Sequence, residues 1–251
     1  MRSITSVQNP EIKHVVRLHC AKNRRKYNQT FAEGLRTVTT LIQAGISIDK
    51  LYITQEHQLD AYTTIRDIII VSPEVMAKMS AATTPSGILA VFMPPAPCDL
   101  AQISSGLVLA QITDPGNMGT LIRTAAACAV SCVIIIEGAD PWSPKVIQAS
   151  AGTIACIKLF ACTWPALVAS KKQLELCALV VTNGTPLQEL KQSRLDARDT
   201  MLLVVGNESQ GLPLEWQKQC QLRVSIPMPG GTESLNAAIA GSIALYSMYV
   251  L

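Results

Sequence analysis

The sequence predicts an α/β fold built around a parallel sheet, and two patterns indicate it. Short apolar runs alternate with helix-like stretches along the second half of the chain, an order typical of α/β proteins. The apolar runs, such as Leu107–Ile112 and Cys132–Ile136, are continuous rather than alternating, which indicates strands buried on both faces of a parallel sheet. With 49% apolar and 16% charged residues among 251, the chain has material for a large core and does not resemble a disordered protein.

The first part of the chain is expected to form a smaller α/β region. Residues 11–26 have the pattern of a basic helix, and Leu35–Ala44 that of a second helix, which Gly45 is well placed to end. The other expected elements are strands at Lys50–Thr54, Ile68–Val71 and Gly87–Phe92 and a short helix at Pro73–Met79.

A proline-rich stretch separates this region from the rest. Met93-Pro94-Pro95-Ala96-Pro97 is incompatible with regular structure, because each proline fixes φ and lacks an amide donor. We therefore expect a first domain over residues 1–95, a linker over 96–105 and a second domain over 106–251.

The second domain repeats a strand–loop–helix order. Further strands are expected at Ile154–Phe160, Leu176–Thr182, Met201–Val205 and Leu222–Ile226, and helices at Leu121–Val130, Pro144–Ser150 and Pro165–Leu174. The last stretch, 234–251, has no charged side chain, and about 18 such residues is the lower limit for a membrane span. Because serine, asparagine and glycine interrupt it, we expect a buried helix instead, with part of its apolar surface covered at a subunit interface.

Charge is distributed unevenly along the chain. Residues 1–36 hold eight Lys or Arg and two Glu, giving +6, whereas the whole chain carries +3. A basic end on a mildly acidic body predicts contact with a polyanion, and the alternative is a solvated helix face. The densest cations, and hence the candidate nucleic-acid contacts, are Lys22, Arg24, Arg25 and Lys26.

The eight cysteines do not indicate a metal site. None forms C-x-x-C, and no paired histidines accompany them, so we expect no zinc and no other metal. Most lie among apolar residues, where a thiol behaves as a small buried hydrophobe. The first ten residues lack the apolar core of a signal peptide, and a reducing cytoplasm is the expected location.

Three segments rich in glycine and asparagine carry the functional signal. Each follows an apolar run and leads into a helix-like stretch, where α/β enzymes place their ligand-binding loops. No Lys-Ser/Thr pair follows the glycines, and none reads G-x-G-x-x-G, so phosphate-loop and dinucleotide motifs are excluded. The segments are Asp114–Arg123, Val205–Leu212 and Ile226–Asn236.

The second domain contains no histidine, since all three lie at 14, 19 and 57. Histidine-dependent hydrolases are therefore disfavoured, and the polar residues of the segments suit the positioning of two reactants for group transfer. Arg123 is the one charge on an otherwise apolar helix. It is interpreted as a clamp on phosphate, with a surface salt bridge as the alternative.

Together the three segments resemble the SpoU (TrmH-like) family of RNA ribose 2′-O-methyltransferases, within the SPOUT class. The first matches D-P-x-N-x-G-x-x-x-R-T-A, the second G-x-E-x-x-G-L and the third I-P-M-x-G-x-x-x-S-L-N. The likeness is strong over residues 106–251. Residues 3–92 resemble more weakly the L30e-like RNA-binding domain that often precedes this domain, through Ser6–Pro10, Arg24-Arg25 and Phe31–Gly34.

The resemblance implies a SPOUT-type parallel sheet with a deep carboxyl-terminal trefoil knot, against the general rule that chains are not knotted. It also implies a homodimer formed through the carboxyl-terminal domain. The implied cofactor is S-adenosylmethionine, and the backbone expected to hold it surrounds Gly184, Gly206, Ile226, Met228 and Leu235.

The implied reaction is attack of a ribose 2′-hydroxyl on the cofactor's methyl group. Since arginine is too basic to deprotonate easily, Arg123 is expected to stabilise the developing negative charge and to position the hydroxyl and a phosphate. The expected partners in orienting substrate and loops are Asn117, Glu208, Ser234 and Asn236, some of them from the second subunit.

The sequence does not identify which RNA is the substrate. Ribosomal RNA is favoured over transfer RNA because of the fused first domain. A catalytically silent RNA-binding or assembly factor with the same fold is the main alternative, although the intact polar set argues against it. Methylation of a base instead of a ribose is a weaker third possibility.

Overall fold

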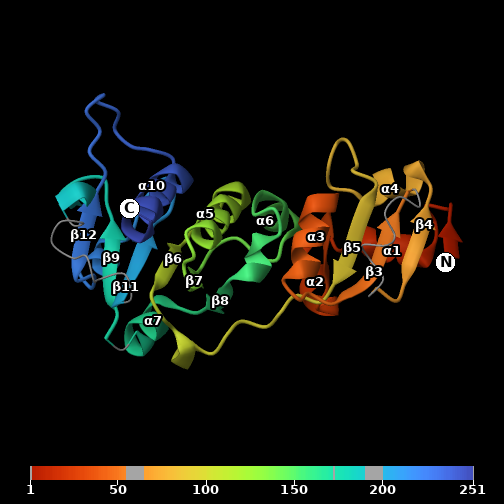
Figure 1. Ribbon diagram of the computed structural model, residues 1–251, viewed down its shortest axis with the longest axis horizontal. Coiled ribbons are helices and arrows are strands. Elements are labelled where there is room, and N and C mark those ends of the chain that lie inside the picture. Colours follow the sequence, from red (N-terminus) through yellow and green to blue (C-terminus); the bar gives the residue numbers. More distant parts are fainter. Residues whose placement is uncertain (1, 55–64, 172, 190–199, 251) are drawn as a thin grey trace. The chain divides into compact units, whose positions relative to one another are not determined.

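The computed structural model describes residues 2–54, 65–171, 173–189 and 200–250 (Figure 1). Contacts between residues divide the chain into two compact units. The first unit comprises Met1–Ala96 together with Asp140–Cys156, and the second comprises Pro97–Ala139 and Ile157–Leu251. Each unit has its own sheet and core.

The sheet of the first unit is mixed. β4 (Ile68–Val71) lies parallel to both β1 (Arg2–Ile4) and β3 (Ile48–Ile53), whereas β5 (Ile88–Phe92) runs antiparallel to β3 and to β2 (Thr30–Glu33). The strand order is β1-β4-β3-β5-β2. The accompanying helices are α1 (Pro10–Arg17), α2 (Ala21–Tyr27), α3 (Leu35–Gln43) and α4 (Pro73–Met79), with α1 packed on α4.

The single helix predicted over residues 11–26 is in fact two. α1 begins at Pro10, where the Asn9 side chain accepts a hydrogen bond from the Glu11 amide at 2.8 Å, and it ends at Arg17. Cys20 is extended and starts α2. The break frees the carbonyls of Leu18 and His19, and Arg24 donates to both, at 3.1 and 3.0 Å. A buried guanidinium thus satisfies backbone groups that a continuous helix would pair internally.

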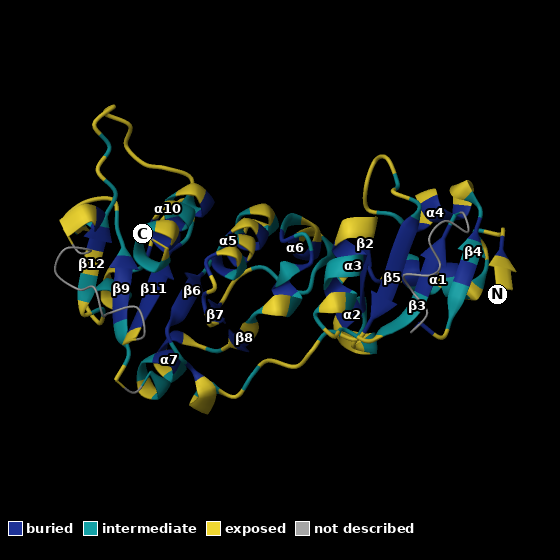
Figure 2. Cartoon of the chain, viewed as in Figure 1, coloured by how far each residue is buried: buried dark blue, intermediate teal, exposed yellow. Residues whose placement is uncertain are grey.

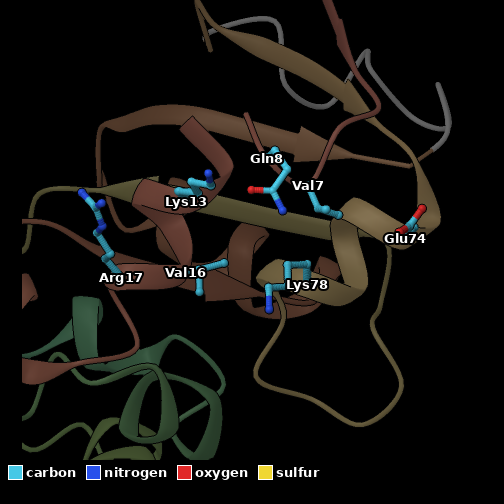
Figure 3. A pocket seen from close by; sticks show the side chains of 7 residues that line it. All are labelled: Val7, Gln8, Lys13, Val16, Arg17, Glu74 and Lys78. Carbon is cyan, nitrogen blue, oxygen red and sulfur yellow. The ribbon is translucent and has the colours of Figure 1, made fainter. Parts of the chain in front are cut away.

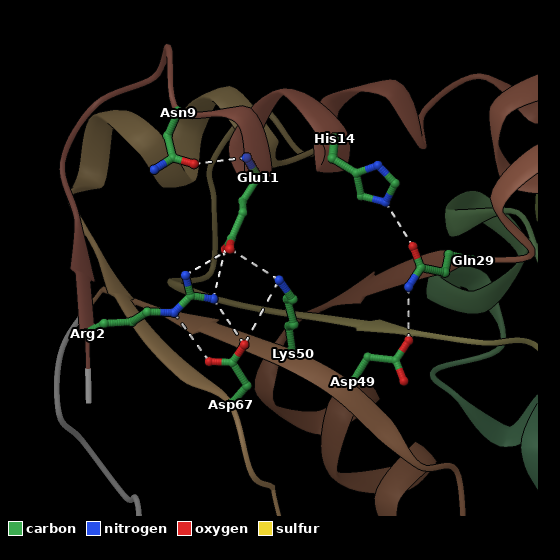
Figure 4. A network of polar contacts seen from close by, with 8 residues as sticks. All are labelled: Arg2, Asn9, Glu11, His14, Gln29, Asp49, Lys50 and Asp67. Carbon is green, nitrogen blue, oxygen red and sulfur yellow. Dashed lines mark hydrogen bonds and ion pairs between the residues drawn. The ribbon is translucent and has the colours of Figure 1, made fainter.

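Two strands of the first unit, β1 and β2, were not predicted. β1 has three residues, too few for a period to show. Polar contacts around its first residue hold it in place (Figure 4): Arg2 contacts Glu11 at 2.8 Å and Asp67 at 3.0 Å, and Lys50 contacts Glu11 at 3.3 Å. These side chains are exposed or partly exposed, so solvent weakens each pair.

Residues 140–156 lie between β7 (Cys132–Ile136) and β8 (Lys158–Ala161) in the chain, yet they pack within the first unit. Arg24 forms an ion pair with Asp140 at 2.7 Å, and the Thr30 hydroxyl donates to the Trp142 carbonyl at 2.7 Å. The Trp142 ring meets Phe92 edge-on. The domain predicted over 106–251 includes this segment, whereas its contacts assign it to the first unit.

The same segment corrects one predicted strand. Ile154–Phe160 was expected to be extended, but Thr153–Cys156 forms a short 3-10 helix, η3, after α6 (Pro144–Ala149). The strand begins only at Lys158. Ile154 is fully buried and η3 packs on α3. The apolar run at 154–160 shows no clear periodicity, so its conformation was decided by this tertiary packing.

The second unit has a seven-stranded sheet in which every pairing is parallel. β6, β7 and β11 are buried at every residue, as Figure 2 shows, which confirms the parallel sheet predicted from continuous apolar runs. The strands are β6 (Gly106–Ala110), β7 (Cys132–Ile136), β8 (Lys158–Ala161), β9 (Glu175–Leu179), β10 (Thr185–Pro186), β11 (Met201–Val205) and β12 (Leu222–Ser225).

The order β10-β12-β9-β11-β6-β7-β8 contains a reversal. From β6 the chain proceeds to β7 and β8 on one side, and then crosses to β9 and β11 on the other. The carboxyl ends of β6 and β11 therefore flank the point where ligand crevices form in open α/β sheets. The trefoil knot implied by the resemblance stays a prediction.

Two long helices of the second unit pack together beside this point. α5 (Pro115–Ala127) lies against α10 (Ala237–Tyr249), and the hydroxyls of Thr124 and Ser242 lie 2.9 Å apart. Gly241 permits the close approach, because a Cβ there would overlap the Leu121 side chain. Shorter helices of this unit are η2 (Leu100–Gln102), α7 (Trp164–Ser170) and α9 (Leu214–Gln217).

No helix within the described residues is long and apolar enough to cross a membrane. α10 has 13 residues, so the uncharged stretch 234–251 forms a helix over only part of its length, after an irregular segment.

Candidate functional site

The three glycine- and asparagine-bearing segments lie at the carboxyl ends of β6, β11 and β12. The first does not form a loop throughout, because α5 begins at Pro115 rather than at the predicted Leu121. Asp114 is the N-cap, and its carboxylate accepts a hydrogen bond from the Asn117 amide at 2.7 Å. Asp114-Pro115 therefore starts the helix, with proline in its first turn. Asn117 also lies in this first turn.

Asn117 joins all three segments. Its side-chain nitrogen donates to Glu208 in the second segment at 3.1 Å. Its side-chain oxygen accepts from the amide of Asn236 in the third segment at 3.1 Å. Asn236 in turn is the N-cap of α10 and accepts from the backbone of Ala238 at 2.9 Å. Asn117, Glu208 and Asn236 therefore form one hydrogen-bonded group, as expected for residues of a single site.

The Glu208 carboxylate also accepts hydrogen bonds from the backbone amides of Asp114 and Thr113, at 3.2 and 3.4 Å. Partial burial raises the pKa of this carboxyl, but the hydrogen bonds from Asn117 and from the two amides outweigh burial, so that the pKa lies below its ordinary value of 4.5. Glu208 is thus held ionised at neutral pH by donors aimed at it. In the structure the hydrogen bonds that it accepts from the Thr113 and Asp114 amides hold the start of α5.

We expect Glu208→Gln to lower the free energy of unfolding at neutral pH by about 0.5–1 kcal/mol, because an exposed carboxylate loses charge-assisted hydrogen bonds. A group with a depressed folded pKa stabilises the protein above its unfolded pKa and loses that effect as pH falls through the folded one. The difference between wild type and variant should therefore be full at pH 7 and shrink below pH 4.5. Urea unfolding across that range measures it, and a difference independent of pH would contradict the assignment.

A cavity of ≈ 450 Å³ lies beside this hydrogen-bonded group in the second unit. It is lined by residues that follow β9, β11 and β12, with Glu208 at its wall. Of the ten residues proposed for catalysis or cofactor binding, six line it: Gly206, Glu208, Ile226, Met228, Ser234 and Leu235. The volume lies in the usual range of about 300–1,000 Å³ for small-molecule sites, and the lining combines apolar side chains with exposed backbone.

Glycine is required at one wall of this cavity. The backbones of Asn207 and Gly211 pair with each other at 3.1 and 3.0 Å, which folds the second segment into a tight loop. A Cβ on Gly206 would overlap the backbone of Gly211 and Leu212. Gly206 is therefore needed for the loop to close over the end of β11.

Gly184 does not line the cavity, although its neighbours Thr182 and Asn183 do. Its carbonyl accepts a hydrogen bond from the Ser225 hydroxyl at 3.0 Å, and a Cβ there would come within 2.7 Å of the Val224 backbone. The structure thus places Gly184 against β12, beside the cavity wall.

Arg123 lies outside this group. It is exposed on α5, does not line the cavity, and its side chain makes no hydrogen bond or ion pair within the described part of the chain. The salt-bridge alternative for Arg123 therefore finds no support among the described residues. An exposed guanidinium without a protein partner remains available to an external anion.

The four cations proposed to contact RNA differ in their surroundings. Lys22, Arg25 and Lys26 are exposed on α2, with the Lys26 ammonium over the Tyr27 ring. Arg24 is only 8% exposed, and its donors are directed at Asp140 and at two backbone carbonyls. These protein contacts account for Arg24 without any contact to RNA. The prediction of RNA contact therefore rests on the three exposed cations.

Sequence reasoning missed several lining residues. Leu179 ends β9 and Val180 follows it, Leu214 and Gln217 belong to α9, and Arg223 lies on β12. For Leu179 and Val180, the turn signature Asn183-Gly184 directly after a predicted strand could have indicated that they lie near the site. α9 has four residues and follows a proline, so its position gave no periodic signal. Among the described residues, no cluster of His, Cys, Asp and Glu suited to a metal ion occurs.

Comparisons with known proteins agree with this geometry. Residues 105–246 match the SpoU rRNA Methylase family, and residues 9–90 match the MRM3-like substrate binding domain. The 23S rRNA (guanosine(2553)-2′-O)-methyltransferase RlmP of Bacillus subtilis is 29% identical, with 99% of each chain covered. A Synechocystis protein described as an uncharacterized tRNA/rRNA methyltransferase is 31% identical over 97% of this chain and 92% of its own.

A solved structure is similar over the whole chain. The AdoMet-bound rRNA methyltransferase from Sinorhizobium meliloti superposes with a TM-score of 0.87 at 27% identity, covering 100% of this chain and 98% of its own. The family match spans the sheet, the three segments and the cavity described above. The chain therefore belongs to the SpoU rRNA Methylase family.

Proposed function

We propose that this protein is an S-adenosylmethionine-dependent methyltransferase that modifies a ribose 2′-hydroxyl in ribosomal RNA. The observation that carries the proposal is the hydrogen-bonded group of Asn117, Glu208 and Asn236, which ties three family segments into one site beside a cavity. The names of relatives that match along the whole chain favour ribosomal RNA.

The cavity suits the proposed cofactor. Ile226, Met228 and Leu235 offer apolar surface to an adenine ring and a thioether, while the loop at Gly206 brings backbone groups to the wall. Few charged side chains line it, and Glu208 and Arg223 are the exceptions. When bound, the cofactor supplies an activated methyl group on sulfur. This chain's own residues have to hold it, exclude water and position the hydroxyl.

A ribose hydroxyl is a weak acid, so the site has to stabilise negative charge on the oxygen as its proton leaves. Arg123 is the proposed stabiliser, since it carries a permanent charge and has no protein partner in the described chain. Asn117, Ser234 and Asn236 would orient the substrate and the loops, and Glu208 would keep Asn117 in place.

The test is methyl transfer to RNA by the purified protein. Ribosomal RNA from a strain lacking the gene should accept a methyl group, and nucleoside mass spectrometry should find it on the ribose. A methylated base would contradict the proposed chemistry. Methylation of transfer RNA instead would support the runner-up substrate, which the name of the Synechocystis relative keeps open. Failure of the cofactor to bind at millimolar concentration in calorimetry would favour a catalytically silent RNA-binding factor.

We also infer that the protein acts as a homodimer through its carboxyl-terminal domain. Four exposed apolar side chains are spaced three or four residues apart and so form a stripe. They are Ile239, Ile243 and Tyr246 on α10 and Val250 at its C-cap, each 43–52% exposed. Apolar stripes of this kind mark protein interfaces. α5, which carries Arg123, packs on the same helix, so a second subunit covering α10 would lie near Arg123.

Ile243→Asp should convert the dimer to a monomer, because a carboxylate would be buried without a partner in the interface. Light scattering on the purified protein measures the change. Lys218→Asp is a suitable control, since Lys218 is exposed and pairs with Glu215 on the surface. A dimer that survives Ile243→Asp would exclude this face.

A further inference from the structure

A second cavity, of ≈ 520 Å³, lies in the first unit between α1 and α4 (Figure 3). It is separate from α2, which holds the cations singled out from the sequence. Its lining residues are Val7, Gln8, Lys13, Val16, Arg17, Glu74 and Lys78.

Three cations line this cavity. Lys13 and Arg17 are four residues apart on α1 and so share one face of the helix, and Lys78 belongs to α4. All three are exposed, and none has an ion pair or side-chain hydrogen bond in the described chain. With one carboxylate, that of Glu74, the lining has a formal charge of +2.

Three other cations of the same unit are paired with carboxylates instead. Arg2 and Lys50 contact Glu11 and Asp67, and Arg24 contacts Asp140. Like charges that outnumber the nearby counter-charges repel one another, and an external anion relieves that repulsion. The unpaired set around the cavity therefore indicates a binding surface for an anion.

The rest of the lining indicates which kind of anion. Val7 and Val16 contribute small aliphatic surface, and none of the seven lining residues is aromatic, so there is no platform on which an unpaired base would stack. Exposed cations on two helices suit a polyanion that passes over the surface, whereas a site for a small free anion buries its ligand. Phosphate contacts of this type position a nucleic acid without reading its sequence.

We propose that the cavity between α1 and α4 binds backbone phosphates of the substrate RNA, held by Lys13, Arg17 and Lys78. Arg17 offers a planar fork to phosphate oxygens, and the two lysines act as point charges. This inference rests on the proposed function and adds to it a place where RNA contacts the first unit. Gln8 supplies a further neutral donor at the cavity wall.

The salt dependence of RNA binding tests the proposal. For the full-length protein and a transcript of its own organism's 23S RNA, the logarithm of the binding constant is plotted against the logarithm of salt concentration. Arg17→Ala and Lys78→Ala should each reduce the slope by about 1, as expected for loss of one phosphate contact. Arg36→Ala is the matched control, because Arg36 is exposed on α3 and does not line the cavity. Cofactor affinity should not change in any of the three.

A variant expected to bind RNA more tightly tests whether weaker binding in the alanine variants results only from a damaged fold. Glu74→Gln removes the only carboxylate of the lining and should tighten RNA binding several-fold, since repulsion between this carboxylate and the phosphates is removed. A damaged fold would not bind more tightly. Figure 3 shows Glu74 at the end of the cavity away from Arg17, so the two changes act on different parts of the surface.

The outcomes separate this inference from the proposed function. If Arg17→Ala and Lys78→Ala keep the slope of wild type while the protein methylates RNA, the inference is wrong and the function stands. If both slopes fall but the wild-type protein transfers no methyl group, the phosphate site stands and the function is wrong. Unchanged affinity in Glu74→Gln would also overturn the inference.

Discussion

Arg123→Ala is expected to reduce the rate of methyl transfer by about 10²–10³-fold, the usual loss when one stabiliser of developing negative charge is removed. The side chain is exposed and has no partner in the described chain. Its removal should therefore leave the free energy of unfolding within about 0.5 kcal/mol of wild type. Single-turnover transfer of a labelled methyl group measures the rate, and calorimetry should find cofactor binding unchanged.

Arg123→Lys is the informative companion. It keeps the charge but loses the planar fork, so an intermediate rate is expected if the guanidinium positions both hydroxyl and phosphate. Wild-type turnover in Arg123→Ala would remove the residue from the mechanism.

Gly206→Ala is expected to weaken cofactor binding by two orders of magnitude or more, because the added Cβ overlaps the backbone of Gly211 and Leu212 and backbone cannot move aside as a side chain can. The loop would have to open, and with it the cavity wall that Gly206 and Glu208 share. Titration calorimetry with S-adenosylmethionine measures the loss.

Gly230→Ala is the matched control for this change. Gly230 belongs to the third segment, but a Cβ there meets no atom within 4 Å and its φ is not in the left-handed region. It also does not line the cavity. We expect affinity close to that of wild type, and equal losses in the two variants would show that the overlap at Gly206 is not the cause.

The two inactive variants together test how the site is assembled. If Arg123 acts on the cavity of the other subunit, mixed dimers of Arg123→Ala and Gly206→Ala each contain one complete site. A one-to-one mixture should then recover about a quarter of wild-type activity, since half the dimers are mixed and each has one of two sites intact. No recovery would place Arg123 and the cavity in the same subunit.

Much of the sheet was predictable because buried parallel strands are continuous apolar runs. β7 and β11 have the predicted bounds, and so have β4 and α4 in the first unit. Proline and serine mark the start of α4 and α6, so local chemistry sufficed there. The missed elements β10 and α9 have only two and four residues and show neither a period nor a continuous apolar run, unlike the four-residue run of β4.

The sequence by itself determined the parallel α/β class, the three ordered segments and the family they resemble, because these depend on residue type and spacing along the chain. Only the tertiary structure decided which polar residues meet. It showed that Asn117 links Glu208 to Asn236, that Arg24 is buried against Asp140, and that Arg123 stands apart from the cavity. These partners are separated by 91 to 119 residues. Contacts over such separations follow from strand order and helix packing, and no local pattern encodes them.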